Sequence, residues 1–179
     1  MSGGGTVNQG DSVTLVASPY SGYQFVRWKK DGNEVGTSSK LTVKNINANG
    51  NYVAEFKQVS YKVRVTSNHS YGGSTSGDVN VGYGSETTIT ATANPGYKFD
   101  GWYEGNNKVS SDAKYKVTNI TSDKTFTAVF NQCQYNVAAQ VSPQEGGSVS
   151  GTGTYNQGDT VRLKANPNNG YAFTGWFLN

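Results

Sequence analysis

The 179 residues carry 15 Lys and Arg against 12 Asp and Glu, and the resulting net charge of +3 is spread along the chain without a basic block. Nucleic-acid-binding proteins cluster their basic residues, so this pattern argues against a nucleic-acid partner. No apolar run is long enough to span a membrane, and no signal peptide is visible. With 23 Gly, 4 Pro and 12% aromatic residues, the composition indicates a turn-rich β protein whose aromatic side chains supply much of the core.

One unit of sequence recurs along the whole chain. Trp28, Trp102 and Trp176 stand 74 positions apart, and each closes a copy of the pattern Gly-Tyr-x-Phe-x-x-Trp. The same offset aligns most other landmarks without an insertion, so the chain holds roughly 2.4 copies of one repeat. We expect the repeats to span residues 1–58, 59–132 and 133–179. With this division the first repeat lacks its first strand and the third lacks its last two. The alternative phase starts each unit after the Gly-rich stretch, near Gly77 in the middle copy.

The complete middle copy predicts five short strands, taken here in chain order. Apolar and polar residues alternate in four of them, and the aromatic motif forms the fifth; the ranges are 61–67, 86–93, 96–102, 114–120 and 124–130. The stretches between them, 70–85, 104–112 and 121–123, are rich in Gly, Asn, Asp and Ser and are predicted to be connections. Little or no helix is expected, at most one short turn near Ser110 to Ala113. The prediction is a mostly β, antiparallel architecture.

The aromatic motif itself admits two interpretations. Exposed Trp and Tyr rings can stack on sugars, whereas the largest side chain of a small sheet is needed in its core. Tyr97 and Phe99 share a face by alternation, but Trp102 lies an odd number of residues beyond Phe99. A β-bulge at Asp100 and Gly101 would return the indole to the core side, and Arg27 at the equivalent place shows that positive φ is not required there. We favour the core interpretation.

Ligand contacts are then expected where the copies differ. Just after the tryptophan stand Lys29, Tyr103 and Phe177, and in the turn before the motif stand Tyr20, Asn94 and Asn168. The candidate ligand contacts are therefore the aromatic members Tyr20, Tyr103 and Phe177.

Residues for catalysis or metal binding are sparse. His69 is the only histidine, in a Gly/Ser-rich turn, and Cys133 is the only cysteine, which excludes an internal disulfide, a histidine triad and the usual zinc spacings. No pair of carboxylates recurs between copies. We therefore predict no catalytic, cofactor-binding or metal site, and no enzyme activity. The sequons "NHS" and "NIT" matter only in a host that glycosylates them.

In the third copy, "GGSVSGTGTYNQGDTVRLKANPNNGYAFTGW" resembles the divergent B-repeat of bacterial surface proteins, which is related to the listerial internalin B-repeat; "NYVAEF" and "FTAVF" match its closing part. The resemblance covers nearly the whole chain. It implies a small β-grasp-like or related module, found in tandem in secreted or envelope-attached proteins, without catalytic residues. A β-grasp sheet is normally crossed by a helix, which this sequence hardly offers.

These observations predict a stalk or adhesion segment of a bacterial cell-surface protein, located outside the cell and attached to the wall or envelope. Its partner would be a host or envelope glycan or protein. The joints "FKQVSYK" and "FNQCQYN" are short, so swivel between repeats should be limited. The protein is expected to be monomeric, or to exchange strands at its incomplete ends. The alternative is a carbohydrate- or peptide-binding module that uses the variable aromatics.

Overall fold

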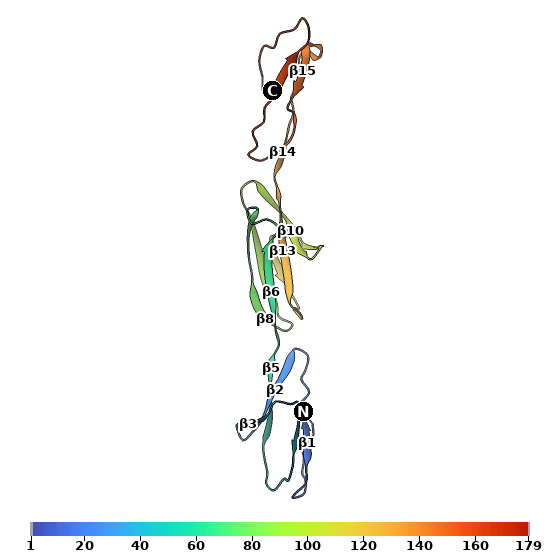
Figure 1. Cartoon of the computed structure of the whole chain (residues 1–179), viewed down its shortest axis with the longest axis vertical. Helices are drawn as coiled ribbons and strands as arrows, with labels where there is room; N and C mark the ends of the chain where they lie inside the picture. The colour runs from blue at the N-terminus through green and yellow to red at the C-terminus, as the bar shows by residue number, and fades with distance from the viewer. Residues whose placement is uncertain (1, 179) are drawn as a thin grey trace. The chain divides into compact units, whose positions relative to one another are not determined.

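The computed structural model describes residues 2–178, which consist mainly of β-strands joined by turns (Figure 1). Within those residues the only helical piece is a 3-10 turn, η1, at Gln144–Gly146. The strands form several small sheets, and most of their paired strands run antiparallel. The predicted fold class, tandem small antiparallel sheets with almost no helix, is confirmed.

The first copy forms two small sheets. β1 pairs with β4, and β2 lies between β3 and β5. The strands are β1 (Val13–Val16), β2 (Tyr23–Lys30), β3 (Asn33–Gly36), β4 (Lys40–Val43) and β5 (Tyr52–Gln58). Leu15, Ala17 and Trp28 are buried together, and further apolar side chains pack around them: Val13, Phe25, Leu41, Val43, Tyr52 and Ala54.

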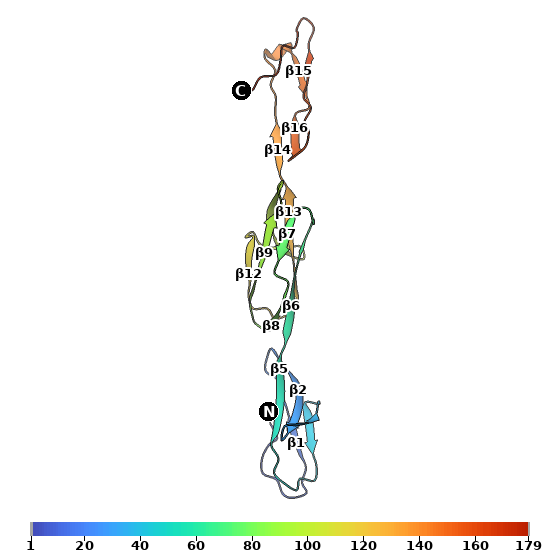
Figure 2. The same ribbon diagram turned by 90° about the vertical axis from the view of Figure 1, so that its left-hand side faces the viewer.

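The middle copy has eight strands in two sheets, ordered β11-β10-β13-β6-β8 and β12-β9-β7 (Figures 1 and 2). They are β6 (Ser60–Ser67), β7 (Gly73–Ser76), β8 (Val79–Gly82), β9 (Thr87–Ala93), β10 (Tyr97–Glu104), β11 (Asn107–Ser110), β12 (Lys114–Val117) and β13 (Lys124–Gln132). Both sheets contribute buried side chains, namely Val63, Ile89, Ala91, Trp102, Val117, Phe126, Ala128 and Phe130, with Ile120 from a connection.

The two central strands of the larger sheet, β6 and β13, run in the same direction. Lys62 N–H donates to Asp123 Oδ1 at 2.8 Å, and the hydroxyls of Thr66 and Thr127 lie 3.2 Å apart. Both contacts join residues that are 61 positions apart, so residue numbers increase in the same direction along the two strands and the pair is parallel. The sheet is therefore mixed, with one parallel pair among antiparallel hairpins. No helix crosses it in the described part of the chain.

The third copy contains four strands, β14 (Gln134–Val137), β15 (Gly147–Ser150), β16 (Gly153–Asn156) and β17 (Lys164–Pro167). β14 pairs with β16, and β15 pairs with β17. Its aromatic motif, residues 171–178, carries no strand. None of the described side chains from 133 to 178 reaches full burial.

One sequence-based expectation about the middle copy is wrong. Two stretches predicted as connections contain strands: 70–85 contains β7 and β8, and 104–112 contains β11. Strand pairing uses backbone groups, so a Gly- and Ser-rich stretch can pair even though it lacks an apolar pattern. No helical turn forms at Ser110 to Ala113, where Ser110 is the last residue of β11. The Ala113 carbonyl accepts hydrogen bonds from the Ala91 N–H and from the Trp102 indole.

The predicted bulge is present. The register between β10 and β13 shifts between Phe99 and Gly101, which leaves Asp100 as the extra residue. Gly101 does not have positive φ, so the bulge does not require a left-handed backbone conformation. Trp102 is returned to the core side and is 0% exposed, and Trp28 at the same bulge in β2 is also 0% exposed. The core interpretation of the motif is confirmed in these two copies.

Candidate functional site

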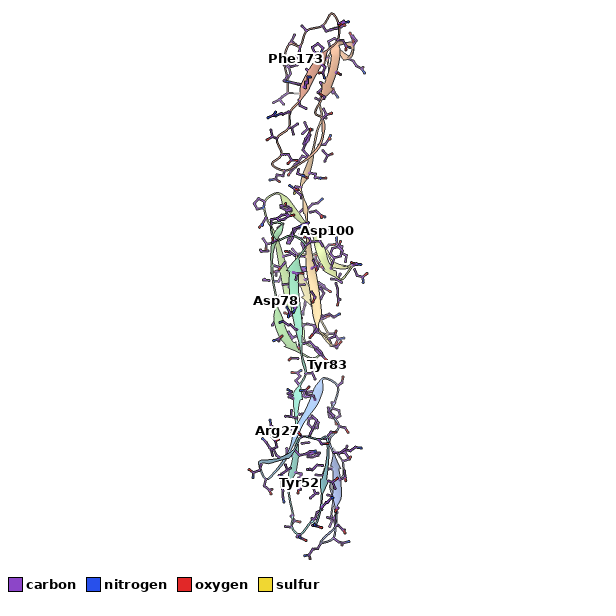
Figure 3. The ribbon with its side chains drawn as sticks, in the orientation of Figure 1. Arg27, Tyr52, Asp78, Tyr83, Asp100 and Phe173 are labelled. Atoms are coloured by element: carbon purple, nitrogen blue, oxygen red, sulfur yellow. The ribbon has the colours of Figure 1, made fainter. Side chains whose placement is uncertain are left out.

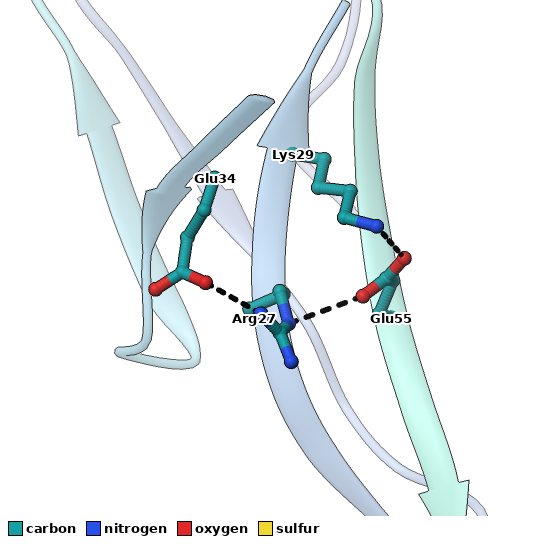
Figure 4. Close-up of polar contacts among 4 residues, drawn as sticks. All are labelled: Arg27, Lys29, Glu34 and Glu55. Atoms are coloured by element: carbon teal, nitrogen blue, oxygen red, sulfur yellow. Dashed lines mark hydrogen bonds and ion pairs between the residues drawn. The ribbon is translucent and has the colours of Figure 1, made fainter. Parts of the chain in front are cut away.

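The hairpin that carries the tryptophan presents a charged outer face in the first copy (Figure 4). Arg27 Nη1 donates to Glu34 Oε2 at 2.6 Å, and its Nε lies 3.2 Å from Glu55 Oε2, close enough for an ion pair but without hydrogen-bond geometry. Lys29 Nζ lies 2.5 Å from Glu55 Oε1. These side chains are 34–46% exposed, so each pair contributes only about 0–1 kcal/mol. Lys29 is thus engaged with its own sheet.

The second copy builds a different cluster at the same place. Asp100 Oδ2 accepts a hydrogen bond from the Tyr103 hydroxyl at 2.7 Å and lies 3.1 Å from Lys108 Nζ. The Lys108 ammonium also stands 6.0 Å from the centre of the Tyr103 ring. A Cβ on Gly101 would meet the Lys108 side chain and would lie 2.6 Å from the Ser110 carbonyl oxygen, and the backbone clash accounts for the glycine at this position.

The two hairpins carry their ion pair with opposite polarity. The arm of the hairpin supplies Glu34 in the first copy and Lys108 in the second, at positions 74 apart. The bulge supplies the residue of opposite charge, which is Arg27 in the first copy and Asp100 in the second. The hairpin therefore keeps an attractive pair across the bulge while its charges change, which is typical of a structural pair. The 74-residue offset aligns Glu34 with Lys108, but it aligns Arg27 with Gly101 and Asp100 with Val26, so the sequence alignment shows only one half of the reversal.

Two pKa values in the second-copy cluster move away from neutrality. The Tyr103 hydroxyl and then the Lys108 ammonium hold the pKa of Asp100 below its ordinary value. The hydrogen bond to the Asp100 carboxylate, followed by desolvation, raises the pKa of Tyr103. An acid or base for catalysis works best when its pKa lies near the operating pH. The pKa of Asp100 is lowered and that of Tyr103 is raised, so both lie further from neutral pH than usual. The two groups are therefore suited to stabilising the hairpin by their hydrogen bond.

The three predicted ligand contacts occupy different settings. Tyr103 is half-buried and bonded as above, whereas Tyr20 is 87% exposed in the turn before β2 and Phe177 is 80% exposed. The Asn residues that replace Tyr20 in the other copies, Asn94 and Asn168, donate side-chain hydrogen bonds to backbone carbonyls of an earlier loop. Asn94 Nδ2 donates to the Tyr71 carbonyl at 3.0 Å, and Asn168 Nδ2 bonds its preceding loop likewise. The structure thus brings none of the three predicted contacts into one site.

An aromatic group that the sequence analysis did not identify surrounds His69. Its ring stacks on Tyr71, with centroids 5.1 Å apart and planes 9° from parallel, and Nδ1 lies 3.3 Å from the Tyr71 hydroxyl. Tyr71 also packs against Tyr97 at 5.8 Å. The histidine is a surface stacking residue in this arrangement. The sequence signal for this aromatic group is the short spacing of His69 and Tyr71 in "NHSY".

The joint between the first and second copies is a single residue bonded on both sides. The Val59 N–H donates to the Gly22 carbonyl at 2.8 Å, and the Val59 carbonyl accepts from the Tyr83 N–H at 2.9 Å. Cys133 does the same one repeat later, with the Gly96 carbonyl at 2.7 Å and the Gln157 N–H at 2.9 Å.

Side chains tighten the first joint (Figure 3). The Ser21 hydroxyl donates to Tyr83 Oη at 2.8 Å, and the Tyr83 ring covers Gly22. Gly22 has φ of 79°, and a Cβ there would lie 2.5 Å from the ring, so only glycine fits. At the second joint Gln157 stands where Tyr83 does, with its side chain 3.9 Å from the position of a Gly96 Cβ, a looser contact.

A family model described as the divergent InlB B-repeat domain matches the chain three times, at residues 1–60, 63–134 and 137–179. The chain belongs to this family. No curated protein and no solved structure matches it.

Each of the three B-repeat matches contains one copy of the tryptophan motif, so the family assignment follows the 74-residue period. Membership makes the chain a tandem-repeat module. Within residues 2–178 of this B-repeat protein, no three His, Cys, Asp or Glu side chains are grouped to hold a metal ion. The described residues also include no helix of the length and apolarity needed to cross a membrane.

Proposed function

We propose that the chain is a non-catalytic stalk or adhesion segment of a secreted or cell-surface bacterial protein. The observation that carries this proposal is the joint, where one linker residue has both of its backbone groups bonded, one to each neighbouring copy. A flexible Gly/Ser linker would leave these groups in water and the copies free to swivel. A bonded joint instead transmits position from one repeat to the next, which a stalk needs.

The repeat boundaries are part of the same proposal. With divisions at 1–58, 59–132 and 133–179, Val59 and Cys133 become the first residues of the second and third repeats. These are the two residues that bond to both neighbours. We also propose an extracellular location, attached to the wall or envelope, on the strength of the family description. Antibody against the chain should label intact cells of the source organism as strongly as permeabilised ones.

The stalk proposal predicts that Tyr83→Gln loosens the first joint. The variant loses the hydroxyl bond to Ser21 and the ring over Gly22, contacts worth together about 1 kcal/mol. Amide hydrogen exchange at Val59 should therefore become roughly five- to tenfold faster, while exchange at Cys133 is unchanged. Tyr20→Gln, at a side chain that is 87% exposed, is the matched control. Unchanged exchange at Val59 would show that the side chain does not stabilise the joint and would remove support for a stiff stalk.

The second candidate is a carbohydrate- or peptide-binding module. It is favoured by the exposure of Tyr20 and Phe177, at 87% and 80%. On a glycan array, binding that is lost in Tyr20→Ala or Phe177→Ala with an unchanged circular dichroism spectrum would support it. Absence of binding by the parent chain would leave the stalk role. Tyr103→Ala is less informative, because Tyr103 is already bonded to Asp100.

A further inference from the structure

The chain enters and leaves the middle copy along two neighbouring strands. It enters along β6 and leaves along β13, and these strands lie side by side in the larger sheet (Figure 1). Because the pair is parallel, the start of β6 at Ser60 and the end of β13 at Gln132 lie at its opposite ends. The joint residues Val59 and Cys133 adjoin these two ends. Tension along the chain therefore acts on β6 at one end of the pair and on β13 at the other.

This arrangement loads the pair in shear. The two strands can separate only by sliding past each other, so the contacts between them must break together. An antiparallel hairpin that is pulled at its two free ends instead opens one contact at a time, because the force is concentrated on a single contact. Breaking several contacts at once is a slow step, and resistance to forced unfolding is governed by the rate of that step.

Contacts join the two strands along their length. Lys62 N–H donates to Asp123 Oδ1 at 2.8 Å near the entry end, and the Thr66 and Thr127 hydroxyls lie 3.2 Å apart further along. Beyond the last residue of β6, hydrogen bonds of Asn68 continue the pairing. The pair is thus joined from its entry end to its exit end, as resistance to sliding requires.

The exit end of the pair is held by the backbone and by side chains. Asn68 N–H donates to the Ala128 carbonyl at 3.0 Å, and the Asn68 side-chain amide bonds the N–H and the carbonyl of Phe130, at 2.9 Å and 3.1 Å. Phe130 is 1% exposed and lies on Gly72 and Gly73, where an added Cβ would come within 2.8 Å and 2.5 Å of its side chain. β13 can slide only if this ring leaves the core, so burial of the ring adds to the resistance.

We propose that β6 and β13 form a force-bearing clamp, by which the middle copy resists tension applied along the chain. In the described part of the chain the first copy has no counterpart of β6 and the third has none of β13, so the middle copy alone shows the clamp. The clamp deepens the stalk function and rests on it for its biological role. Its mechanical strength is a property of the sheet and is measured separately.

Single-molecule force spectroscopy on the full chain tests the clamp by comparing two pulling directions. Handles are attached through cysteines at exposed positions in a Cys133→Ser background. In the shear arrangement the handles are at Ser60→Cys and Asn131→Cys, at opposite ends of the pair. In the peeling arrangement they are at Ser60→Cys and Ser122→Cys, at the same end. The sheet is the same in both, so we expect the clamp to show as a severalfold higher unfolding force in the shear arrangement at one loading rate.

Asn68→Ala tests the exit end of the clamp. At constant force in the shear arrangement it should unfold roughly tenfold faster, because it removes the side-chain hydrogen bonds from a set that must break together. In the peeling arrangement the rate should not change, because the contacts at the Lys62 end break first. Asn94→Ala is the matched control, since it also loses a side-chain bond to a backbone carbonyl but lies outside the pair, and it should unfold at the parent rate in shear.

Three results would overturn the clamp: equal unfolding forces in the two arrangements, equal acceleration by Asn68→Ala in both, or acceleration by Asn94→Ala as large as that by Asn68→Ala. None of them would alter the hydrogen exchange measured at Val59. The clamp and the stiff joint can therefore fail independently of each other.

Discussion

Trp102→Ala should lower the free energy of unfolding by about 3–5 kcal/mol, the usual cost of emptying a large buried aromatic site. The indole is 0% exposed, packs edge-on against Phe99 at 5.8 Å and donates to the Ala113 carbonyl at 3.3 Å. Alanine would leave a cavity and remove one of the hydrogen bonds to that carbonyl. The small size of each repeat makes this a large share of its stability, because native domains are marginally stable.

Urea denaturation followed by circular dichroism measures this effect, with Trp176→Ala as the control. Trp176 occupies the same motif position but is 47% exposed, so its replacement should cost roughly 1 kcal/mol or less. The comparison separates position in the motif from burial in the fold. Equal losses in the two variants would contradict the burial of Trp102 in the core, as would a Trp102→Ala variant as stable as the parent chain.

Asn68→Ala should cost about 1–2 kcal/mol through the loss of two hydrogen bonds. Asn68 Oδ1 accepts from the Phe130 N–H at 2.9 Å, and its Nδ2 donates to the Phe130 carbonyl at 3.1 Å. The amide thereby extends the pairing of β13 beyond the end of β6. A glycan on the sequon at Asn68 would have to break the Nδ2 bond, so we expect no glycosylation of the folded chain at this residue.

Asn68→Asp separates the two bonds, because a carboxylate keeps the acceptor and loses the donor. Near neutral pH, the free energy of unfolding of Asn68→Asp should therefore lie between that of the parent chain and that of Asn68→Ala, measured by the same urea denaturation. If Asn68→Ala were as stable as the parent, water would be satisfying the Phe130 backbone, and the Asn would have no structural role.

Particular residues show how far the sequence leads. The spacing of the three tryptophans predicts the repeat, and the odd step from Phe99 to Trp102 predicts the bulge, because both are local patterns with a fixed period. The edge strands β7, β8 and β11 were missed, since their stability comes from backbone pairing with neighbours that no side-chain pattern marks. Tyr103 was singled out as variable, but variability alone does not show that its hydroxyl is held by Asp100.

The repeat period, the strand alternation and the bulge before the tryptophan were determined by the sequence itself, because each follows from which residues repeat and at what spacing. Burial of the tryptophan depends on the strand that covers it, since Trp28 and Trp102 are 0% exposed and Trp176 is 47% exposed. The partners of those residues were decided only by tertiary structure. The reversed ion pairs and the Tyr83 ring over Gly22 depend on contacts that no short stretch of sequence contains. Such contacts depend on strand register and on which strand lies beside which, and those are properties of the folded sheets.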